Sequence, residues 1–392
     1  MTDARFGAAL SVHPIPTAAA GEIAGELLDR FGGESPDLLV LFASPHHVGA
    51  LDDELAAVRD IVEPRVAFGG TAVSIAGGNR EVEEQPALSA LAAQWGADAT
   101  VTPVRLIAPE PSESGDDGAR VVFDGWPASN VVDAAHTLLL FADPFSFPAD
   151  AFCAQLADEH PHLVVVGGLA SAGRGPGGNR LILDGNVLRD GAVGVLLGGS
   201  TRVETVVSQG CRPIGDPFTV TRADQNLVYE LGGTPPLERF QTIVDGLDDE
   251  TRLMLRSGLH VGVVVDERKV DFDRGDFLVR NVLGADRSTG AMAIGDYVHT
   301  GQVLQFHVRD AASADDDLRH HLTGHDGARA ALLFTCNGRG TSLFPWADHD
   351  TGVVEELLGP VPLAGAFCAG EIGPIGGRPF LHGFTASLAL FT

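Results

Sequence analysis

The chain has 392 residues, of which 44% are hydrophobic and 20% are charged, a balance typical of a globular protein with two domains. Its formal net charge is −27, and Lys269 is the single lysine. A surface this acidic repels phosphate backbones and anionic membranes, so we expect no nucleic-acid partner and no membrane partner. No apolar run approaches the ~20 residues of a membrane-spanning helix, and no secretory signal is visible, which favours a cytoplasmic protein.

The metal-binding and redox residue types show no recognisable spacing. The four cysteines are Cys153, Cys211, Cys336 and Cys368. Without a CxxC pair they argue against a zinc ribbon and a disulfide framework, and favour reduced thiols. The pairs His46-His47 and His320-His321, together with His325, have no carboxylate at a metal-ligand spacing, so we predict solvated histidines, no metal site and no cofactor.

Along the chain, one pattern occurs three times. The tetrapeptide Gly-Gly-Asn-Arg stands at residues 77–80 and 177–180, and a related Gly-Gly-Arg at 376–378. Each copy follows a short apolar strand, a stretch of helical period and a second strand that ends in small residues. The first strands are expected within 38–45, 138–144 and 331–337, and the second strands within 66–70, 164–168 and 362–365. The spacing between the two strands suits a helical crossover between parallel neighbours.

The segments around these copies are more varied. A helix is expected from Leu88 through Leu91 to Trp95, and a strand at 226–233 is expected to close the first domain. Residues 237–255 have a helical pattern. Further strands are expected at 261–265, 277–283 and 302–308, the last two paired as a hairpin through 291–294.

We therefore predict a mixed α/β (α+β) fold of two pseudo-repeated domains, whose mixed β-sheets are flanked by helices. The boundary is expected near residue 230, which gives an N-terminal domain of residues 1–230 with its core at 36–227, and a C-terminal domain of residues 231–392. Two arrangements stay open. The halves form separate pseudo-symmetric sheets, or the third copy completes a layer begun by the first two.

The third copy holds the densest group of polar and reactive side chains. Cys336, Asn337 and Arg339 follow its first strand, and Cys368 and Glu371 follow its second. The ends of adjacent strands commonly form a ligand crevice. Arg339 can grip a carboxylate through two parallel hydrogen bonds, and Glu371 can accept from an amine, which together suit an amino acid. The alternative is that Arg339 and Glu371 pair with each other and pin the two loops.

An enzymatic alternative uses Cys336 or Cys368 as nucleophile, with His382 as base and Glu371 as the residue that orients it. A buried cysteine is usually a small apolar side chain, so we assign no catalytic residue and do not predict an enzyme.

In the first copy, Arg80 and Glu81 stand in an extended stretch where Glu81 and Glu83 share one side and face either a ligand or nearby arginines. Ser171 lies in a glycine-rich stretch without the GxSxG spacing of a hydrolase. We keep Arg80, Glu81 and Ser171 as ligand-binding candidates.

These segments resemble the FIST family, the F-box and intracellular signal transduction proteins, with N-terminal and C-terminal FIST domains in a stand-alone form. The N-terminal likeness rests on LLVLFASPHH, GGTAVSIAGGNREVEEQPALS and QGCRPIGDPFTVT. The C-terminal likeness rests on LLFTCNGRG, PLAGAFCAGEIGPIGG and LHGFTASL. The family often has a cysteine where this chain has Thr71, which puts any chemistry of that cysteine in doubt here.

The resemblance implies an intracellular sensory module that binds a small ligand such as an amino acid, and it implies no established catalysis. The family's motif positions fall on Asn337, Arg339, Glu371 and His382. No F-box, kinase or membrane segment is visible, so the signal is expected to pass through a partner protein or through homo-oligomerisation. The alternatives are a cysteine-dependent enzyme that acts on a small carboxylate or amide, and a protein–protein adaptor.

Overall fold

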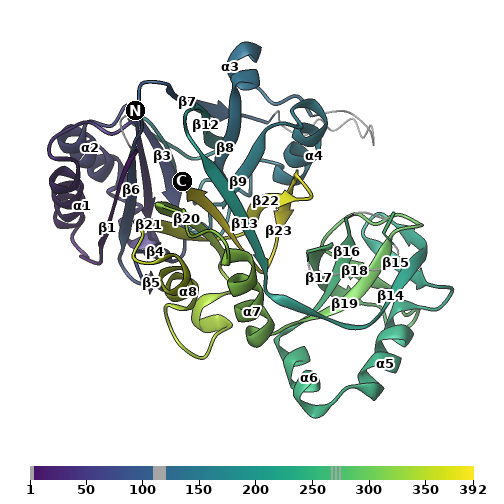
Figure 1. Cartoon of the computed structure of the whole chain (residues 1–392). Helices are drawn as coiled ribbons and strands as arrows, with labels where there is room; N and C mark the ends of the chain where they lie inside the picture. Colours follow the sequence, from purple (N-terminus) through teal and green to yellow (C-terminus); the bar gives the residue numbers. More distant parts are fainter. Residues whose placement is uncertain (1–3, 109–120, 266–267, 270–271, 273–274) are drawn as a thin grey trace. The chain divides into compact units, whose positions relative to one another are not determined.

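The computed structural model describes residues 4–108, 121–265, 268–269, 272 and 275–392 (Figure 1). The chain forms two compact units. The first comprises residues 1–207, 318–381 and 385–392, and the second comprises residues 208–317 and 382–384. Within the described residues, no helix is long and apolar enough to cross a membrane.

The first unit is built from three structural repeats, although residues 208–209, 311–317 and 382 of repeat 3 belong to the second unit. Repeat 1 consists of β1 (Arg5–Ser11), α1 (Pro16–Phe31), β2 (Leu38–Ala43), the 3₁₀ turn η1 (Pro45–His47), α2 (Leu51–Val62), β3 (Val66–Thr71), β4 (Ile75–Gly77), β5 (Arg80–Val82) and β6 (Leu88–Gln94). Repeat 2 consists of β7 (Ala99–Leu106), α3 (Ser129–Ala134), β8 (Ala135–Ala142), α4 (Ala149–Glu159), β9 (Val164–Leu169), β10 (Leu181–Leu183), β11 (Asn186–Leu188) and β12 (Ala192–Gly199). Repeat 3 consists of β13 (Val203–Gln209), α7 (Ala311–Leu322), β20 (Ala330–Cys336), η3 (Gly340–Ser342), α8 (His349–Leu358), β21 (Leu363–Cys368), β22 (Glu371–Ile375), β23 (Arg378–His382) and β24 (Thr385–Phe391).

The three repeats form three six-stranded sheets with equivalent strand orders. The orders are β1-β6-β2-β3-β10-β11, β7-β12-β8-β9-β22-β23 and β13-β24-β20-β21-β4-β5. In each sheet the central pair is parallel and is joined by a helical crossover, as the sequence predicts. The mixed α/β fold with helices flanking mixed sheets is thus confirmed, and the third copy completes an arrangement begun by the first two.

Each repeat gives its hairpin to another repeat's sheet. The β4–β5 hairpin of repeat 1 pairs with β21 of repeat 3, where Gly77 lies opposite Ala364. The β22–β23 hairpin of repeat 3 pairs with β9, and the β10–β11 hairpin of repeat 2 pairs with β3. The exchange is therefore cyclic. Two of the repeated glycine motifs, at 77–80 and 376–378, form the turns of these hairpins, whereas residues 177–180 precede β10.

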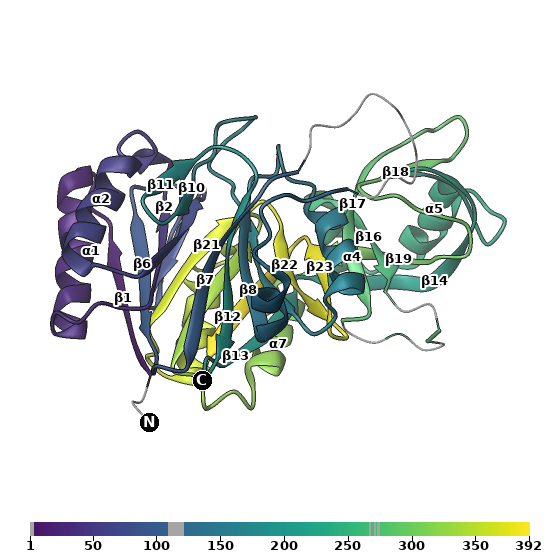
Figure 2. The same ribbon diagram turned by 90° about the horizontal axis from the view of Figure 1, so that it is seen from above.

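The inner faces of the three sheets meet in one apolar core. Phe42, Phe141 and Phe334 occupy equivalent positions in β2, β8 and β20, and all three are fully buried. Their ring centroids lie 5.4, 5.9 and 6.4 Å apart. Side chains alternate across a strand, so the neighbouring leucines face outward and pack under the helices. Figure 2 shows α1 and α2 on the outer side of the first sheet.

The second unit is a closed β-barrel with short helices. Its elements are β14 (Cys211–Asp224), β15 (Leu227–Leu231), α5 (Pro236–Gly246), α6 (Asp249–Met254), η2 (Leu255–Ser257), β16 (Leu259–Val264), β17 (Phe277–Ala285), β18 (Met292–Ile294) and β19 (Val303–Arg309). The barrel order is β14-β15-β18-β17-β16-β19. Its sequence lies between β13 and β20 of repeat 3. The boundary near residue 230 stays a prediction.

The structure corrects three local expectations. Residues 88–94 form β6 rather than a helix, because this strand lies between β1 and β2 with nearly all of its residues buried and so lacks the alternating pattern of a half-exposed strand. The strands at 277–285 and 303–309 do not pair directly, since β16 lies between them. His47 is fully buried rather than solvated, and its Nδ1 lies 2.6 Å from Oε1 of Glu54.

Candidate functional site

The two predicted strand ends of repeat 3 are direct neighbours. Cys336 ends β20 and Cys368 ends β21, and the two residues are paired in the parallel ladder. The backbone N–H of Asn337 donates to the carbonyl oxygen of Cys368 over 2.8 Å, which holds the two loops together. Both cysteines are buried. The predicted convergence of these loops at one sheet edge is therefore present.

Arg339 is buried and forms a two-pronged ion pair. Its Nε donates to Oδ2 of Asp350 over 2.8 Å, and Nη2 donates to Oδ1 over 2.7 Å. The exposed fractions of the two side chains are 1% and 0%. Asp350 also accepts from the Thr335 hydroxyl over 2.6 Å and lies 2.9 Å from Nδ1 of His349. Burial alone would raise the pKa of Asp350, but Arg339 and His349 hold it below its usual range.

The expected partner of Arg339 in the loop-pinning alternative was Glu371, and the structure shows Asp350 instead. Asp350 lies near the start of α8, on the crossover helix, and not on either strand-end loop. One aromatic ring completes the environment. The His349 ring stacks on Phe344 with centroids 3.3 Å apart, and the Arg339 guanidinium lies 5.2 Å from the Phe344 centroid. The ion pair therefore joins a strand end, a helix start and the segment between them.

Glu81 reaches this cluster from repeat 1, on the exchanged β4–β5 hairpin. Its Oε1 accepts from the Thr351 N–H over 3.0 Å. Burial, together with the charge of Asp350, raises the pKa of Glu81 to about 8. Among the described residues, Oε2 of Glu81 and Nη1 of Arg339 are buried without a hydrogen-bond partner. The hairpin exchange thus brings a carboxyl group and a guanidinium into one buried site, each with one atom still unpaired.

Glu371, the first residue of β22, is also fully buried. Its Oε2 accepts from the backbone N–H and the hydroxyl of Thr385, over 3.1 and 2.7 Å. Burial raises the pKa of Glu371 to about 8, against the opposing effects of Thr385, Arg339 and Cys336. Burial and the neighbouring Glu371 also raise the pKa of Cys368 well above its usual value. A nucleophilic cysteine needs the opposite shift.

The remaining predicted site residues lie in different surroundings. Ser171 of repeat 2 accepts from the Val73 N–H of repeat 1 over 2.8 Å and donates to the carbonyl of Phe367 in repeat 3, so it joins all three repeats. Arg80 is exposed at the hairpin turn. His382 is buried and belongs to the second unit. The structure therefore gathers Glu81, Arg339 and the strand-end residues, whereas Arg80 is exposed.

A pocket of about 370 Å³ lies within the second unit, in the range of small-molecule sites. It is lined by Gln209, Cys211, Arg212, Pro213, Phe272, Phe277, Gln305, His307, Ser313 and Asp317. Sequence reasoning missed this pocket as a site. The signal that could have found it was the motif QGCRPIGDP, which supplies several of the lining residues.

The pocket carries both signs of charge. Nε of Arg212 donates to Oδ2 of Asp310 over 2.9 Å, and Nη2 donates to the Thr251 hydroxyl over 3.1 Å. None of the described residues accepts a hydrogen bond from Nη1 of Arg212. Asp317 accepts from the Gln209 N–H over 2.7 Å. Burial lowers the pKa of His307 to about 4, so this imidazole is neutral at pH 7.

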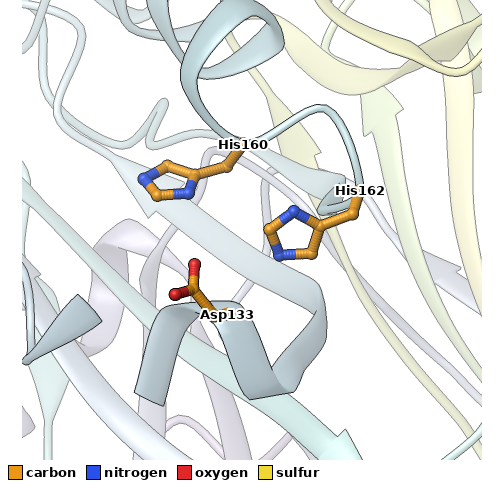
Figure 3. A group of neighbouring side chains, drawn as sticks. All are labelled: Asp133, His160 and His162. Atoms are coloured by element: carbon orange, nitrogen blue, oxygen red, sulfur yellow. The ribbon is translucent and has the colours of Figure 1, made fainter. Parts of the chain in front are cut away.

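One group of side chains in the described part of the chain could hold a metal ion. Asp133, His160 and His162 each offer one ligand atom, and these atoms all lie within 4.8 Å of one another (Figure 3). Asp133 stands 27 positions before His160 in the printed sequence, so no short metal-ligand spacing predicts this group.

The fold and these sites define a protein of three interlocked α/β repeats with a barrel inserted into the third, a buried charged cluster and a polar pocket. Sequence models of the FIST N domain and the FIST C domain match residues 37–234 and 236–374, so the chain belongs to the FIST family. FIST domains are associated with sensors in signal transduction.

Its similar relatives are full-length matches of unassigned activity. The chain is 44% identical over 394 residues to the uncharacterized protein Mb0898c of Mycobacterium bovis, covering 99% of this chain and 98% of the relative. It is 43% identical over 397 residues to the uncharacterized protein MT0656 of Mycobacterium tuberculosis, covering 99% of each. The likeness therefore extends over both units.

Proposed function

We propose that this protein is a cytoplasmic sensor that binds a small molecule of the amino-acid class in the barrel pocket and signals through a partner protein or a second copy of itself. One observation supports an amino acid as the class of ligand. The Arg212 guanidinium, whose Nη1 bonds to none of the described residues, and the Asp317 carboxyl group both line this pocket. A zwitterion offers a carboxylate to the first and an ammonium group to the second. The four buried cysteines, which form no disulfide, support a reducing compartment.

The neutral side chains of the pocket would set the ligand's orientation. Gln305 donates from Nε2 to the carbonyl of Gly215 over 2.7 Å, which leaves its side-chain oxygen as an acceptor. Phe272 and Phe277 pack against each other with centroids 5.7 Å apart and supply an apolar wall. A few polar groups among apolar walls is the usual composition of a specific small-molecule site.

The strand-end cluster is a second candidate site for the same function. The buried Nη1 of Arg339 and Oε2 of Glu81, both without a hydrogen-bond partner among the described residues, favour it. Ligand contact there by Cys336, Asn337, Cys368, Glu371 or Ser171 stays a prediction. The raised pKa of Cys368 argues against this cysteine as the nucleophile of a cysteine-dependent enzyme.

The test is a thermal-shift screen of the purified chain against L-amino acids, their N-acetyl derivatives and their decarboxylated amines, with hits confirmed by calorimetry. Arg212→Gln removes the guanidinium, and Gln305→Glu places a carboxylate where it repels that of the ligand while keeping the Arg212–Asp310 pair. Arg222→Gln is the matched control, because Arg222 is exposed and outside the pocket. The melting temperature without ligand separates loss of fold from loss of binding.

We expect an amino acid to raise the melting temperature of the wild type and of Arg222→Gln, and to lose this effect in both pocket variants. The N-acetyl and amine analogues are expected to bind more weakly, since each lacks one charge. Stabilisation that survives both pocket variants but is lost in Arg339→Lys would move the site to the strand ends. A flat response of folded wild-type protein to the whole panel would refute the amino-acid proposal.

A further inference from the structure

Three side chains from separate segments of repeat 2 converge on one spot of the first unit. Asp133 lies on α3, His160 directly follows the last residue of α4, and His162 lies in the turn before β9 (Figure 3). Their ligand atoms all lie within 4.8 Å of one another. We propose that Asp133, His160 and His162 form a binding site for a divalent cation of the Zn²⁺ class.

The donor set suits such a cation. Two imidazoles and one carboxylate are the ligands that Zn²⁺ and its neighbours in the first transition row accept, whereas Mg²⁺ prefers oxygen ligands throughout. With metal–ligand distances of about 2.0–2.2 Å, tetrahedral ligands stand about 3.4 Å apart. Since no two of the ligand atoms are more than 4.8 Å apart, they must close by at most about 1.4 Å. Asp133 and His162 are exposed, so their side chains can rotate to do so without disturbing the core.

The three side chains converge, but no hydrogen bond or ion pair joins them among the described residues. Within the part of the chain that the structure describes, Asp133 and His160 make no side-chain hydrogen bond or ion pair, although both lie next to groups that could pair with them. His162 is the exception, because its Nε2 lies 3.4 Å from the carbonyl oxygen of Val132. An imidazole that donates from Nε2 keeps the lone pair of Nδ1 for a metal, the arrangement that commonly orients metal-binding histidines.

The surroundings hold the His160 imidazole in place and fix the backbone turn that carries His162. The His160 ring packs against Trp126 with centroids 5.9 Å apart, and Trp126 in turn stacks on Phe152 of α4 at 5.8 Å. Pro161 restricts the backbone between the two histidines. The Leu163 N–H donates to the His160 carbonyl over 2.9 Å and closes the turn. The donors are therefore partly positioned before any cation binds, which lowers the entropy lost on binding.

Three protein ligands leave at least one coordination position for water or for an outside ligand. The site also lies on a chain whose net charge of −27 attracts cations. The proposed role is therefore the capture of a divalent metal ion at an accessible position, separate from the barrel pocket.

The experiment is a calorimetric titration of tag-free, chelator-treated full-length protein with ZnCl₂, and with MgCl₂ as the hard-cation comparison. The site variants are Asp133→Asn and the double variant His160→Ala/His162→Ala. The matched control is His320→Ala/His321→Ala, which removes two neighbouring histidines elsewhere. Co²⁺ is added in a parallel titration, because its visible absorption distinguishes nitrogen and oxygen ligands from thiolate ligands.

We expect one Zn²⁺ per wild-type chain, no measurable Mg²⁺ binding, and an affinity at least about tenfold weaker in both site variants, since even outer-shell partners of metal ligands have effects of that size. The control variant is expected to match the wild type. The Co²⁺ spectrum should show nitrogen and oxygen ligands and no thiolate band. Equal Zn²⁺ affinity in wild type and the double-histidine variant, no binding by the wild type, or a thiolate spectrum would each overturn the proposal.

Discussion

Replacing Arg339 by methionine tests the energetics of the buried cluster. The change keeps most of the apolar stem and removes the guanidinium, leaving the fully buried Asp350 carboxylate without its main counter-ion. Loss of one partner of a buried ion pair costs about 3–5 kcal/mol of folding free energy, because the remaining charge cannot be hydrated. We therefore expect Arg339→Met to lower the free energy of unfolding by that amount.

Removing the other partner, Asp350, should lower the free energy of unfolding by less. In Asp350→Asn the guanidinium stays charged, but Glu81 already interacts electrostatically with Arg339 and is held neutral partly by the charge of Asp350. With that charge removed, the pKa of Glu81 falls and its carboxylate becomes the new counter-ion. The double variant Arg339→Met/Asp350→Asn should be more stable than Arg339→Met alone, since it removes the orphaned charge.

The assay is urea denaturation followed by tryptophan fluorescence. All three tryptophans, Trp95, Trp126 and Trp346, belong to the first unit, so the signal reports on the unit that holds the cluster. Arg105→Met is the matched control, because Arg105 forms an exposed pair with Asp190 that should contribute less than about 1 kcal/mol. A cost below about 1 kcal/mol for Arg339→Met, or a double variant no more stable than it, would refute the reasoning.

Two further predictions concern the same unit. Because the pKa of Glu371 is about 8 in the folded protein and 4.5 for an unperturbed glutamate, its contribution to stability is fully present below about pH 4.5 and is lost as the pH rises through 8. Urea midpoints measured across this range should fall less steeply for Glu371→Gln than for the wild type, and parallel slopes would contradict the assignment. Phe42→Ala should cost about 3–5 kcal/mol in the fluorescence-detected transition, and Phe334→Ala a similar amount, because both rings fill the same core. A large cost for only one of them would mean that the repeats unfold separately.

The sequence predicted those features that depend on neighbouring residues. The apolar runs that include Phe42, Phe141 and Phe334 are strands, and the crossover lengths indicated parallel pairs. The meeting of Cys336 with Cys368 followed from this parallel pairing. The pairing of Arg339 with Asp350 did not, because nothing in the sequence marks one acidic residue of α8 as the buried partner.

Features that depend on pairing between distant segments could not be predicted from the sequence. The hairpin that carries Glu81 leaves its own sheet to join that of repeat 3, and no local pattern specifies which edge a short hairpin will join. The run from Leu88 to Gln94 is rich in alanine and buried on both faces, so it resembled a helix. The barrel pocket combines residues from 209 to 317, which come together only when the barrel strands, the end of β13 and the start of α7 have folded.

The cyclic exchange of hairpins has a consequence for how the chain acquires its structure during synthesis. The sheet of repeat 1 lacks its outer strands until repeat 2 has emerged, and the sheet of repeat 2 lacks its own until residues 371–382 arrive. The β4–β5 hairpin, made early, has no strand to pair with until β21 is present. Formation of the native first unit is therefore delayed until almost the entire chain has left the ribosome, and a chain interrupted early exposes unpaired strand edges that favour aggregation.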